Sequence, residues 1–551
     1  MKKSDTFNST QTASFEAGKW FGRLTIPSRA EGKSRHSINP ERSRRTDFVL
    51  GSELAILEFY EVASGTRKVV LGKAGRQRIQ SARKALEKLM AGQQPIYGVN
   101  TGFGELASQR IPSDKCKQLQ INLVRSHACG VGNPMSRAGA RGLMFLRANE
   151  LARGHSGVRP EVVETIAGCL NSGIVPYIPE KGSVGASGDL APSAHAALVL
   201  IGEGRARIEK NGRSTGWLSG KEALRRCGIA PLSLAEKEGL GLINGTQAMQ
   251  SLGALAIIDA LKVWYTALGA GAMTLEALKG TPSPFREEIH ELKPHTGQME
   301  TAGLLLKLLE DSEIRNSHEA GDLRVQDPYS LRCMPQVHGA VRDILEYAVK
   351  TIETEFSSVT DNPVMIKSDR GWEIVSGGNF HGQAISMAFD CACNAMTVLG
   401  NISERRIFQL VSDSTGILPP FLAADPGLES GFMIAQCTAA ALASDNKVLA
   451  HPSSADSIPT SGNKEDFVSM GMGAALKLSQ VVKNASYITA IEILAGAKAV
   501  ELHAPLKPGK GVRKMLAGLR RIVPATNGDR ELSGAIEKTA QAVLNGYLIP
   551  F

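Results

Sequence analysis

A mostly α-helical fold is predicted by three features of this 551-residue chain. Apolar side chains recur at three- and four-residue spacing over long segments, which is the pattern of helices with a buried face. Several of these segments are apolar on more than one face, so they need other helices on several sides, as in a bundle shared between subunits. Strand patterns are few and occur only around residues 48–57 and 372–377.

The helical segments are expected in the following order. Amphipathic helices are predicted at residues 76–92 and 137–154, and longer, mostly apolar helices at 247–278, 335–357, 382–408, 430–449 and 465–500. The longest charge-poor apolar run, residues 430–444, is shorter than the roughly 18 residues of a membrane-spanning helix. It indicates a buried helix, either in a large core or at a subunit contact.

Composition and charge divide the chain into three parts. Residues 1–45 hold ten Lys or Arg against four acids, which accounts for +6 of the net charge of +9. This segment is rich in Ser and Thr without helical periodicity, so we expect a disordered extension, with a targeting segment or a nucleic-acid arm as the alternatives. A catalytic region is expected over residues 46–504, with a central helical bundle at about 247–500, and a helical C-terminal extension over 505–551.

The other totals favour a cytoplasmic protein with no nucleic-acid or membrane partner. The eight cysteines are scattered with no C-x-x-C pair, which is typical of free thiols in a reducing compartment. After residue 45 no basic stripe is interleaved with aromatic residues. The sequence also lacks a phosphate-binding loop, a complete dinucleotide fingerprint, a nucleophile elbow and an H-E-x-x-H zinc motif. An enzyme built on this chain therefore needs a less usual reactive group.

Residues 181–195, "KGSVGASGDLAPSAH", are dense in small residues and lie between two apolar runs. Gly, Ser, Asp and Pro are typical of a turn, and the same Ala-Ser-Gly tripeptide also occurs as Ala63-Ser64-Gly65. The tripeptide alone therefore does not indicate a function, and the residues around each copy must show whether it has one.

In that context the chain resembles the aromatic amino acid ammonia-lyases. Six more stretches match the motifs of this family and occur in its order: "YGVNTGFGELAS" (97–108), "NLVRSHACGVG" (122–132), "KEGLGLINGTQ" (237–247), "VQDPYSLRCMPQVHG" (325–339), "SGGNFHGQ" (376–383) and "NKVLAHPSSADSIPTSGNKEDFVSM" (446–470). The resemblance covers roughly residues 47–504. It implies a bundle of long helices with little β-structure, a small amino acid as substrate, and a cytosolic homotetramer whose active sites are built from several subunits.

The resemblance also implies a prosthetic group made from the chain itself. In this family an Ala-Ser-Gly triad cyclises autocatalytically to 4-methylidene-imidazol-5-one, here from Ala186, Ser187 and Gly188, with no external cofactor and no metal. The Gly188 nitrogen attacks the Ala186 carbonyl, and loss of water from Ser187 leaves an exocyclic methylene that serves as the electrophile. Residues with little side-chain bulk suit such a strained loop. Ala63-Ser64-Gly65 lacks this context and is expected to be a plain turn.

The matched motifs assign roles to further residues. Tyr97 is expected to remove the β-proton of the substrate, which requires neighbouring hydrogen-bond donors or positive charge. Arg332 is expected to bind the substrate carboxylate through its planar guanidinium group. Hydrogen bonds to the prosthetic group, carboxylate or amine are assigned to Asn244, Gln326 and Tyr329, and packing against the prosthetic group to Phe380. Asp189 is expected to shape the loop rather than catalyse, and His195, His381 and His451 are expected to be structural.

Two positions point to the substrate side chain. Ser126-His127 and Glu465 match the members of the family that act on histidine, whereas members acting on phenylalanine or tyrosine differ at these positions. An imidazole ring offers polar partners to His127 and Glu465, and a phenyl ring would leave both groups unpaired at a cost of about 1–3 kcal/mol. The expected reaction is elimination of ammonia from L-histidine to give trans-urocanate.

Lys464 and Phe467 depart from the pattern of the histidine-specific members. Lys464 either pairs with Glu465 and weakens its interaction with imidazole, or points to solvent. Phe467 replaces a histidine. These departures keep open a related lyase acting on phenylalanine or tyrosine, or an aminomutase that uses the same prosthetic group.

Overall fold

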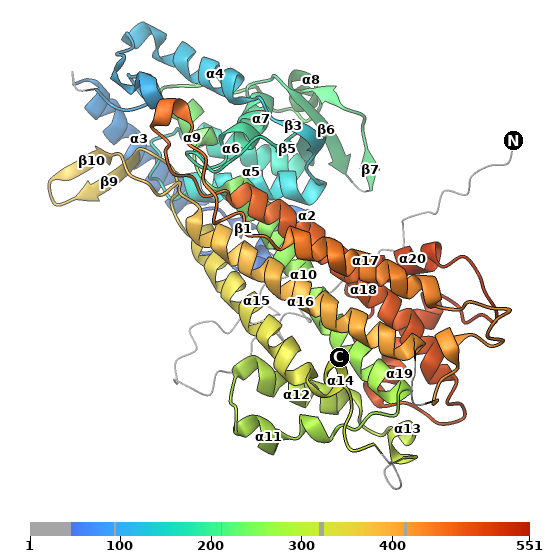
Figure 1. Cartoon of the computed structure of the whole chain (residues 1–551). Coiled ribbons are helices and arrows are strands. Elements are labelled where there is room, and N and C mark those ends of the chain that lie inside the picture. Colours follow the sequence, from blue (N-terminus) through green and yellow to red (C-terminus); the bar gives the residue numbers. More distant parts are fainter. Residues whose placement is uncertain (1–45, 93–94, 211, 319–323, 413–415) are drawn as a thin grey trace, which may run out of the picture. The chain divides into compact units, whose positions relative to one another are not determined.

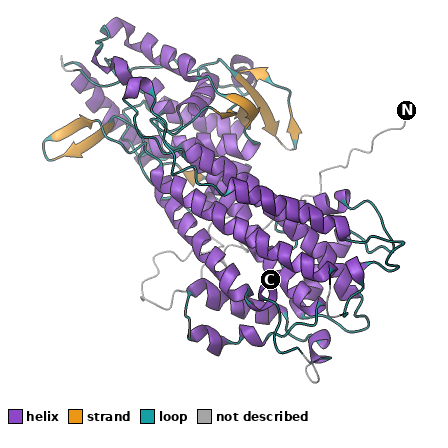
Figure 2. Ribbon diagram, viewed as in Figure 1, coloured by secondary structure: helices purple, strands orange, loops and turns teal. Residues whose placement is uncertain are grey.

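The computed structural model describes residues 46–92, 95–210, 212–318, 324–412 and 416–551. The predicted N-terminal extension, residues 1–45, lies outside them. The described chain is mostly helical with few, short strands (Figure 2), as predicted. Its contacts divide it into two compact units, each assembled from three segments. The first unit comprises Met1–Leu255, Thr351–Ser386 and Ser453–Gly473, and the second comprises Ala256–Lys350, Met387–Pro452 and Ala474–Phe551.

The first unit combines helices with small sheets (Figure 1). Its helices are α2 (Ile56–Ser64), α3 (Lys73–Met90), α4 (Cys116–His127), α5 (Arg137–Leu151), α6 (Pro160–Ser172), α7 (Leu190–Leu200), α8 (Gly220–Arg226) and α9 (Glu238–Ile243). Short 3₁₀ turns occur at η1 (Gly104–Ser108), η2 (Ser113–Lys115) and η5 (Ser461–Asn463).

The strands of the first unit form four separate sheets. The parallel pair is β1 (Phe48–Val49) with β2 (Val69–Val70), and the antiparallel pairs are β3 (Val131–Pro134) with β5 (Pro179–Lys181) and β9 (Val364–Ser368) with β10 (Gly371–Val375). In the fourth sheet, β6 (Arg205–Lys210) pairs antiparallel with β4 (Ile174–Pro176), β7 (Arg213–Ser214) and β8 (Leu218–Ser219).

The second unit is helical in its described residues. It contains α11 (Glu287–Glu291), α12 (Thr296–Leu308), α13 (Glu313–Asn316), α14 (Tyr329–Arg332), α17 (Met433–Leu449), α19 (Lys510–Ile522), α20 (Ser533–Leu544) and the turns η3 (Ser283–Phe285) and η4 (Pro420–Leu422). Four long helices have residues in both units: α10 (Gln247–Ala277), α15 (Met334–Phe356), α16 (Gln383–Val411) and α18 (Gly471–Glu501).

A buried ion pair joins the long helices within the second unit. The Arg406 guanidinium on α16 donates to both carboxylate oxygens of Glu492 on α18, at 2.6 and 2.9 Å, and both side chains are fully buried. Thr274 on α10 and Ser403 on α16 also donate to Glu492. One carboxylate thus connects three helices by directional bonds, and a separate apolar cluster joins α16, α17 and α18.

Three local predictions need correction. The helix predicted from residue 465 begins at Gly471, because the residues before it form a loop held by bonds such as Val468 N to Ser457 Oγ at 2.9 Å. The strand expected around 48–57 is limited to Phe48–Val49 and is followed by α2. Of the two alternatives predicted for residues 430–444, burial in the core of the chain is wrong, since only Ala435, Ala439 and Asn446 of α17 (Met433–Leu449) are buried, and a subunit contact stays a prediction.

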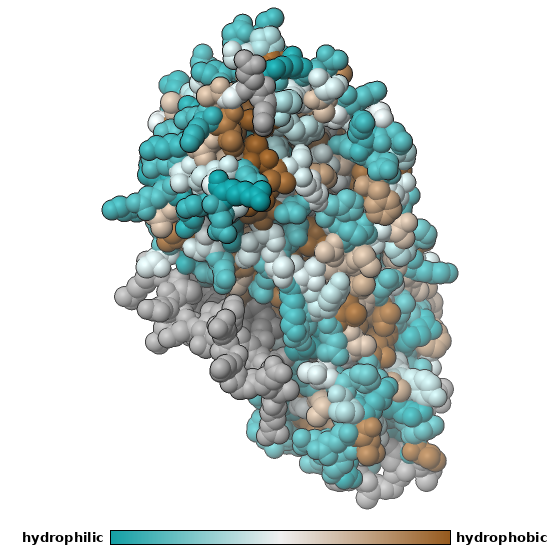
Figure 3. All heavy atoms as spheres, turned by 90° about the vertical axis from the view of Figure 1, so that its left-hand side faces the viewer, coloured by the Kyte–Doolittle hydropathy of each residue, from teal (hydrophilic) through white to brown (hydrophobic). Residues whose placement is uncertain are grey.

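Apolar side chains also reach the surface in both units. The face shown in Figure 3 is mainly hydrophilic, with apolar residues gathered in a few places. The exposed large apolar side chains include Leu106 and Val131 in the first unit and Ile434 and Val448 in the second. Apolar side chains are common on the surface of folded proteins. Ile434 and Val448 differ because both lie on α17, a helix whose apolar sequence predicts that it is buried.

Two helices, α10 and α16, are long and apolar enough to cross a membrane by length and composition. Most of each apolar window is buried inside the protein, 83% for α10 and 72% for α16. Both are therefore core helices of this fold.

The Arg406–Glu492 pair generates a stability prediction. Glu492→Leu should lower the free energy of unfolding by about 3–5 kcal/mol, because it leaves the Arg406 guanidinium buried and uncompensated. The measurement is a denaturant unfolding curve followed by circular dichroism. Glu222→Leu removes an exposed ion pair with Arg225 and serves as the control, with almost no expected change. Equal shifts for the two variants would contradict the structural importance of the buried pair.

Candidate active site

The Ala186-Ser187-Gly188 triad lies in a tight loop of the first unit, immediately before α7. Gly185 and Gly188 have positive φ angles of 83° and 78°, and Gly188 N donates to Gly185 O at 3.3 Å. Ser187 also has a positive φ of 51°, which is uncommon for a residue with a side chain. Such backbone persists only where surrounding contacts enforce it, and strained residues of this kind are found at functional sites.

The backbone of Gly245 supplies the main enforcing contact. Gly245 N donates to Ser187 O at 3.2 Å, and Asp189 N donates to Gly245 O at 2.7 Å. A Cβ atom at Gly188 would lie 2.2 Å from Gly245 O, so only glycine fits at position 188.

The Asp189 carboxylate anchors the loop from the other side. It is fully buried and accepts hydrogen bonds from Ser183 Oγ at 2.7 Å and from Met249 N, near the start of α10, at 2.8 Å. Burial raises the pKa of Asp189 to about 6, and these hydrogen bonds oppose the shift. The contacts are those of a residue that shapes the loop, as expected from the sequence.

Glu465 lies directly at the triad. Ser187 Oγ donates to Glu465 Oε1 at 2.9 Å, and Thr460 Oγ1 donates to Glu465 Oε2 at 2.8 Å. Backbone bonds between Thr460 and Glu465 hold this carboxylate in place. The structure therefore brings together two predicted site residues that are 278 positions apart in the chain.

His127 ends α4 within electrostatic reach of Glu465. Its Nδ1 lies 2.9 Å from the Leu123 carbonyl oxygen, which requires the proton on Nδ1 and leaves Nε2 as an acceptor. Burial lowers the pKa of His127, opposed by the Leu123 bond and the charge of Glu465. A neutral imidazole beside a carboxylate presents two acceptors to a ligand.

Tyr97 belongs to a loop that contacts the segment bearing Glu465. Its hydroxyl oxygen accepts a hydrogen bond from Gly104 N at 3.1 Å, and its ring meets Phe103 edge-on. A Cβ atom at Gly104 would lie 2.3 Å from Ser461 Oγ, so the tyrosine loop and the 460–465 segment are closely packed. The donor that the sequence analysis required at Tyr97 is thus a backbone N–H.

Asn244 and Phe380 also lie in the first unit. Asn244 is buried immediately before Gly245, and its Oδ1 has no hydrogen-bond partner among the described residues. Phe380 is half-buried in the loop preceding α16. The neighbouring His381 stacks on Phe467, with ring centres 5.9 Å apart.

The two departures from the family pattern are both exposed. Lys464 makes no ion pair with Glu465, so of the two alternatives the structure supports the side chain that points to solvent. Phe467 is 63% exposed, and its backbone oxygen lies 3.2 Å from His381 Nε2.

The remaining predicted residues, Gln326, Tyr329 and Arg332, belong to the second unit, whereas the triad belongs to the first. Gln326 and Tyr329 are exposed, and the guanidinium carbon of Arg332 lies 4.5 Å from the centre of the Tyr329 ring. Arg332 Nε is buried without a hydrogen-bond partner among the described residues.

Sequence reasoning missed Thr460 and Gly245. Both lie within quoted motifs, yet nothing in the sequence marks Thr460 as the partner of Glu465 or Gly245 as the partner of Ser187. Within the described ranges, no group of three His, Cys, Asp or Glu side chains has the arrangement of a metal site.

Known proteins are similar to this chain over most of its length. The aromatic amino acid lyase family matches residues 54–521. Histidine ammonia-lyase of Sorangium cellulosum is 49% identical over 509 residues, covering 91% of this chain and 98% of its own, and that of Anaeromyxobacter dehalogenans is 50% identical over 501 residues, covering 90% and 98%.

Solved structures of related enzymes are also similar to this chain. The crystal structure of histidine ammonia-lyase from Trypanosoma cruzi is 39% identical with a TM-score of 0.83, covering 91% of this chain and 94% of its own. Tyrosine aminomutase from Streptomyces globisporus is 38% identical with a TM-score of 0.85, covering 92% and 98%. The resemblance predicted from seven ordered motifs is confirmed, and the chain belongs to the aromatic amino acid lyase family.

Proposed function

We propose that this chain is a histidine ammonia-lyase that converts L-histidine to trans-urocanate and ammonia. Membership of the family makes it a carbon–nitrogen lyase. Relatives with that activity in their names are 48–50% identical over almost their whole length. The observation that carries the proposal is the contact of Glu465 with Ser187, because it puts a carboxylate beside the triad with His127 close by.

The residues present fit the prosthetic group proposed at Ala186-Ser187-Gly188. Position 188 has no room for a side chain, Ser187 has strained backbone, and the Asn244 Oδ1 acceptor is unpaired beside the loop. When formed, a 4-methylidene-imidazol-5-one supplies an electrophile for the substrate amine. No external cofactor or metal is part of this proposal.

The substrate ring is held by Glu465 and His127 in this proposal. An N–H of the substrate imidazole donates to the Glu465 carboxylate in a charge-assisted hydrogen bond, and in the imidazolium form the other ring N–H donates to His127 Nε2. A phenyl ring offers no donor, and losing a hydrogen bond to a charged group costs about 1.5–3 kcal/mol. This cost is the physical basis of selectivity for histidine.

Tyr97 is proposed as the base that takes the β-proton. The Gly104 N–H donates to its hydroxyl oxygen, which orients the oxygen and stabilises negative charge on it when the proton is lost. Arg332 would bind the substrate carboxylate, with Gln326, Tyr329 and Phe380 completing the site.

We also propose a homotetramer with active sites shared between subunits. Gln326, Tyr329 and Arg332 keep exposed or unpaired groups, and α17 exposes Ile434 and Val448 despite its apolar sequence. Cytoplasmic location, and the division into an extension (1–45), a catalytic region (46–504) and a C-terminal extension (505–551), are likewise proposals from the sequence.

A second candidate is a lyase acting on phenylalanine or tyrosine, or an aminomutase. It is favoured by the similarity to a tyrosine aminomutase at 38% identity, and by Lys464 and Phe467 where the histidine-specific pattern differs. The exposure of both residues weakens this alternative, because neither points into the contact between Glu465 and the triad.

Replacing Ser187 tests whether the Ala186-Ser187-Gly188 triad forms the electrophile. Ser187→Ala should fold normally but lose nearly all lyase activity and the near-ultraviolet difference absorbance of the prosthetic group, because no methylene can form. Ser64→Ala is the matched control, since it changes the same tripeptide at the end of α2, and it should be nearly silent. Substantial turnover by Ser187→Ala would show that the electrophile lies elsewhere.

Replacing Glu465 tests the proposed binding of the substrate ring. Glu465→Gln should lower kcat/KM for histidine by roughly 10–100-fold, because a charge-assisted hydrogen bond becomes a neutral one. Any trace activity on phenylalanine should fall less. Lys464→Gln, at the adjacent exposed position, should change kcat/KM by less than about twofold. A larger effect of Lys464→Gln than of Glu465→Gln would contradict this pocket.

A further inference from the structure

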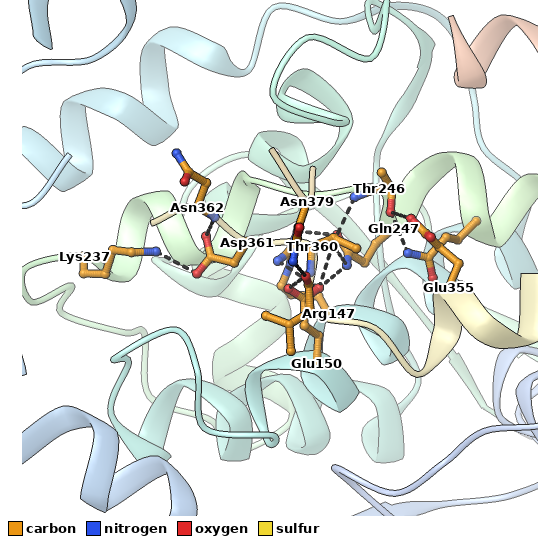
Figure 4. A network of polar contacts seen from close by, with 12 residues as sticks. Arg147, Glu150, Lys237, Thr246, Gln247, Glu355, Thr360, Asp361, Asn362 and Asn379 are labelled. Carbon is orange, nitrogen blue, oxygen red and sulfur yellow. Dashed lines mark hydrogen bonds and ion pairs between the residues drawn. The ribbon is translucent and has the colours of Figure 1, made fainter. Parts of the chain in front are cut away.

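A buried polar cluster lies behind Gly245, on the side away from the triad. A Cβ atom at Gly245 would meet Thr360 Oγ1 at 2.5 Å, Gln247 Oε1 at 2.8 Å and Arg147 Nη2 at 3.0 Å. Figure 4 shows these side chains converging together with Glu150. Gly245 is therefore enclosed between the triad loop and this cluster.

The four side chains of the cluster form one hydrogen-bonded unit. Thr360 donates to Glu150 through its backbone N at 2.8 Å and its Oγ1 at 3.0 Å. Gln247 Nε2 donates to Thr360 Oγ1 at 3.0 Å and also to Glu150, and Arg147 donates to Gln247 Oε1. Arg147, Glu150, Gln247 and Thr360 are each at most 2% exposed.

Stability alone does not account for this cluster. Burying an arginine and a glutamate costs more than their attraction commonly returns, and apolar replacements of such pairs are often neutral or stabilising. Here the pair is also imperfect: Arg147 Nη1 lies 3.6 Å from Glu150 Oε2, and Arg147 Nε and Nη1 have no hydrogen-bond partner in the part of the chain that the structure describes. The hydrogen bonds that join Glu150, Gln247 and Thr360 do, however, hold these side chains in one arrangement.

The hydrogen bonds among these four side chains do not reach residues 186–188 directly. The cluster's effect on the triad passes through Gly245, which donates to Ser187 O and accepts from Asp189 N. We propose that Arg147, Glu150, Gln247 and Thr360 are positioning residues that fix Gly245 and thereby hold the triad loop in the conformation needed for cyclisation. This inference rests on the prosthetic group proposed above.

The step that the cluster would promote is balanced without any other reactant. A bond forms between the Gly188 nitrogen and the Ala186 carbonyl carbon, and that carbonyl oxygen leaves as water with the amide hydrogens. A second water is formed from the Ser187 hydroxyl and the hydrogen on its Cα. The product is lighter than the unmodified chain by two water molecules, and no oxidant is required.

Thr360→Val tests the proposal, because it removes the central hydroxyl while keeping the side-chain shape. The fraction of chains with the two-water mass deficit is measured by peptide mass spectrometry at intervals after a short induction, alongside near-ultraviolet absorbance and thermal stability. We expect the two-water mass deficit to appear roughly tenfold more slowly. This is the effect of one lost buried hydrogen bond on the loop conformation from which cyclisation begins. Thr360→Ser restores the hydroxyl and should mature at close to the normal rate.

Thr274→Val is the matched control. Thr274 Oγ1 donates at 2.9 Å to Glu492, another buried glutamate paired with an arginine, but within the second unit and without contact to Gly245. It should lose comparable thermal stability and mature normally. If Thr360→Val is insoluble, Gln247→Met is measured in the same way with the same expectation.

The outcomes separate the two proposals. Normal maturation of a folded Thr360→Val or Gln247→Met protein would overturn the positioning role while leaving the prosthetic group in place. Slow maturation of Thr274→Val to the same degree would also overturn it, because general destabilisation would then suffice. An unmodified triad in the active wild-type enzyme would overturn the proposed prosthetic group itself.

Discussion

The close approach of two glycines, Gly188 and Gly245, is the constraint on which the site depends. Gly188 has no room for a Cβ atom against Gly245 O, and Gly245 has none against Thr360. The two backbones can therefore exchange hydrogen bonds around Ser187 and keep its φ positive. In this conformation the Ser187 hydroxyl contacts Glu465. A side chain at either glycine would displace the loop and separate the triad from the carboxylate.

Apolar packing and directional polar bonds stabilise different parts of this protein. Within the second unit, apolar faces of long helices are joined by the buried Arg406–Glu492 pair. Within the first unit, loops carry the site, and buried polar groups such as Asp189 and Glu150 hold them. Loops need such anchors because they lack the regular hydrogen bonding of helices, and positions on anchored loops are where reactive groups are commonly found.

Sequence alone predicted the long helices and much of the candidate site, each for an identifiable reason. Periodic apolar residues define α10 to within one residue at its C-terminus, because helix formation there follows local pattern. The start of α18 was missed by six residues, because Met470 and its neighbours are held by distant partners such as Val184 O. Motifs predicted that His127 and Glu465 belong to the candidate site, and the contact of Glu465 with Ser187 agrees, whereas Thr460, Gly245 and the cluster around Arg147 lie there through non-local contacts that no local pattern encodes.

The proposed function depends on Glu465 and His127 binding an imidazole side chain. The most direct measurement incubates the unmodified enzyme with histidine, phenylalanine and tyrosine separately and identifies the products by absorbance and chromatography. We expect trans-urocanate from histidine, with a kcat/KM about tenfold or more above that for the other two substrates, because the hydrogen bond from an imidazole N–H to the Glu465 carboxylate is lost with a phenyl or phenol ring. A higher kcat/KM for phenylalanine or tyrosine, or a β-amino acid as the main product, would contradict it.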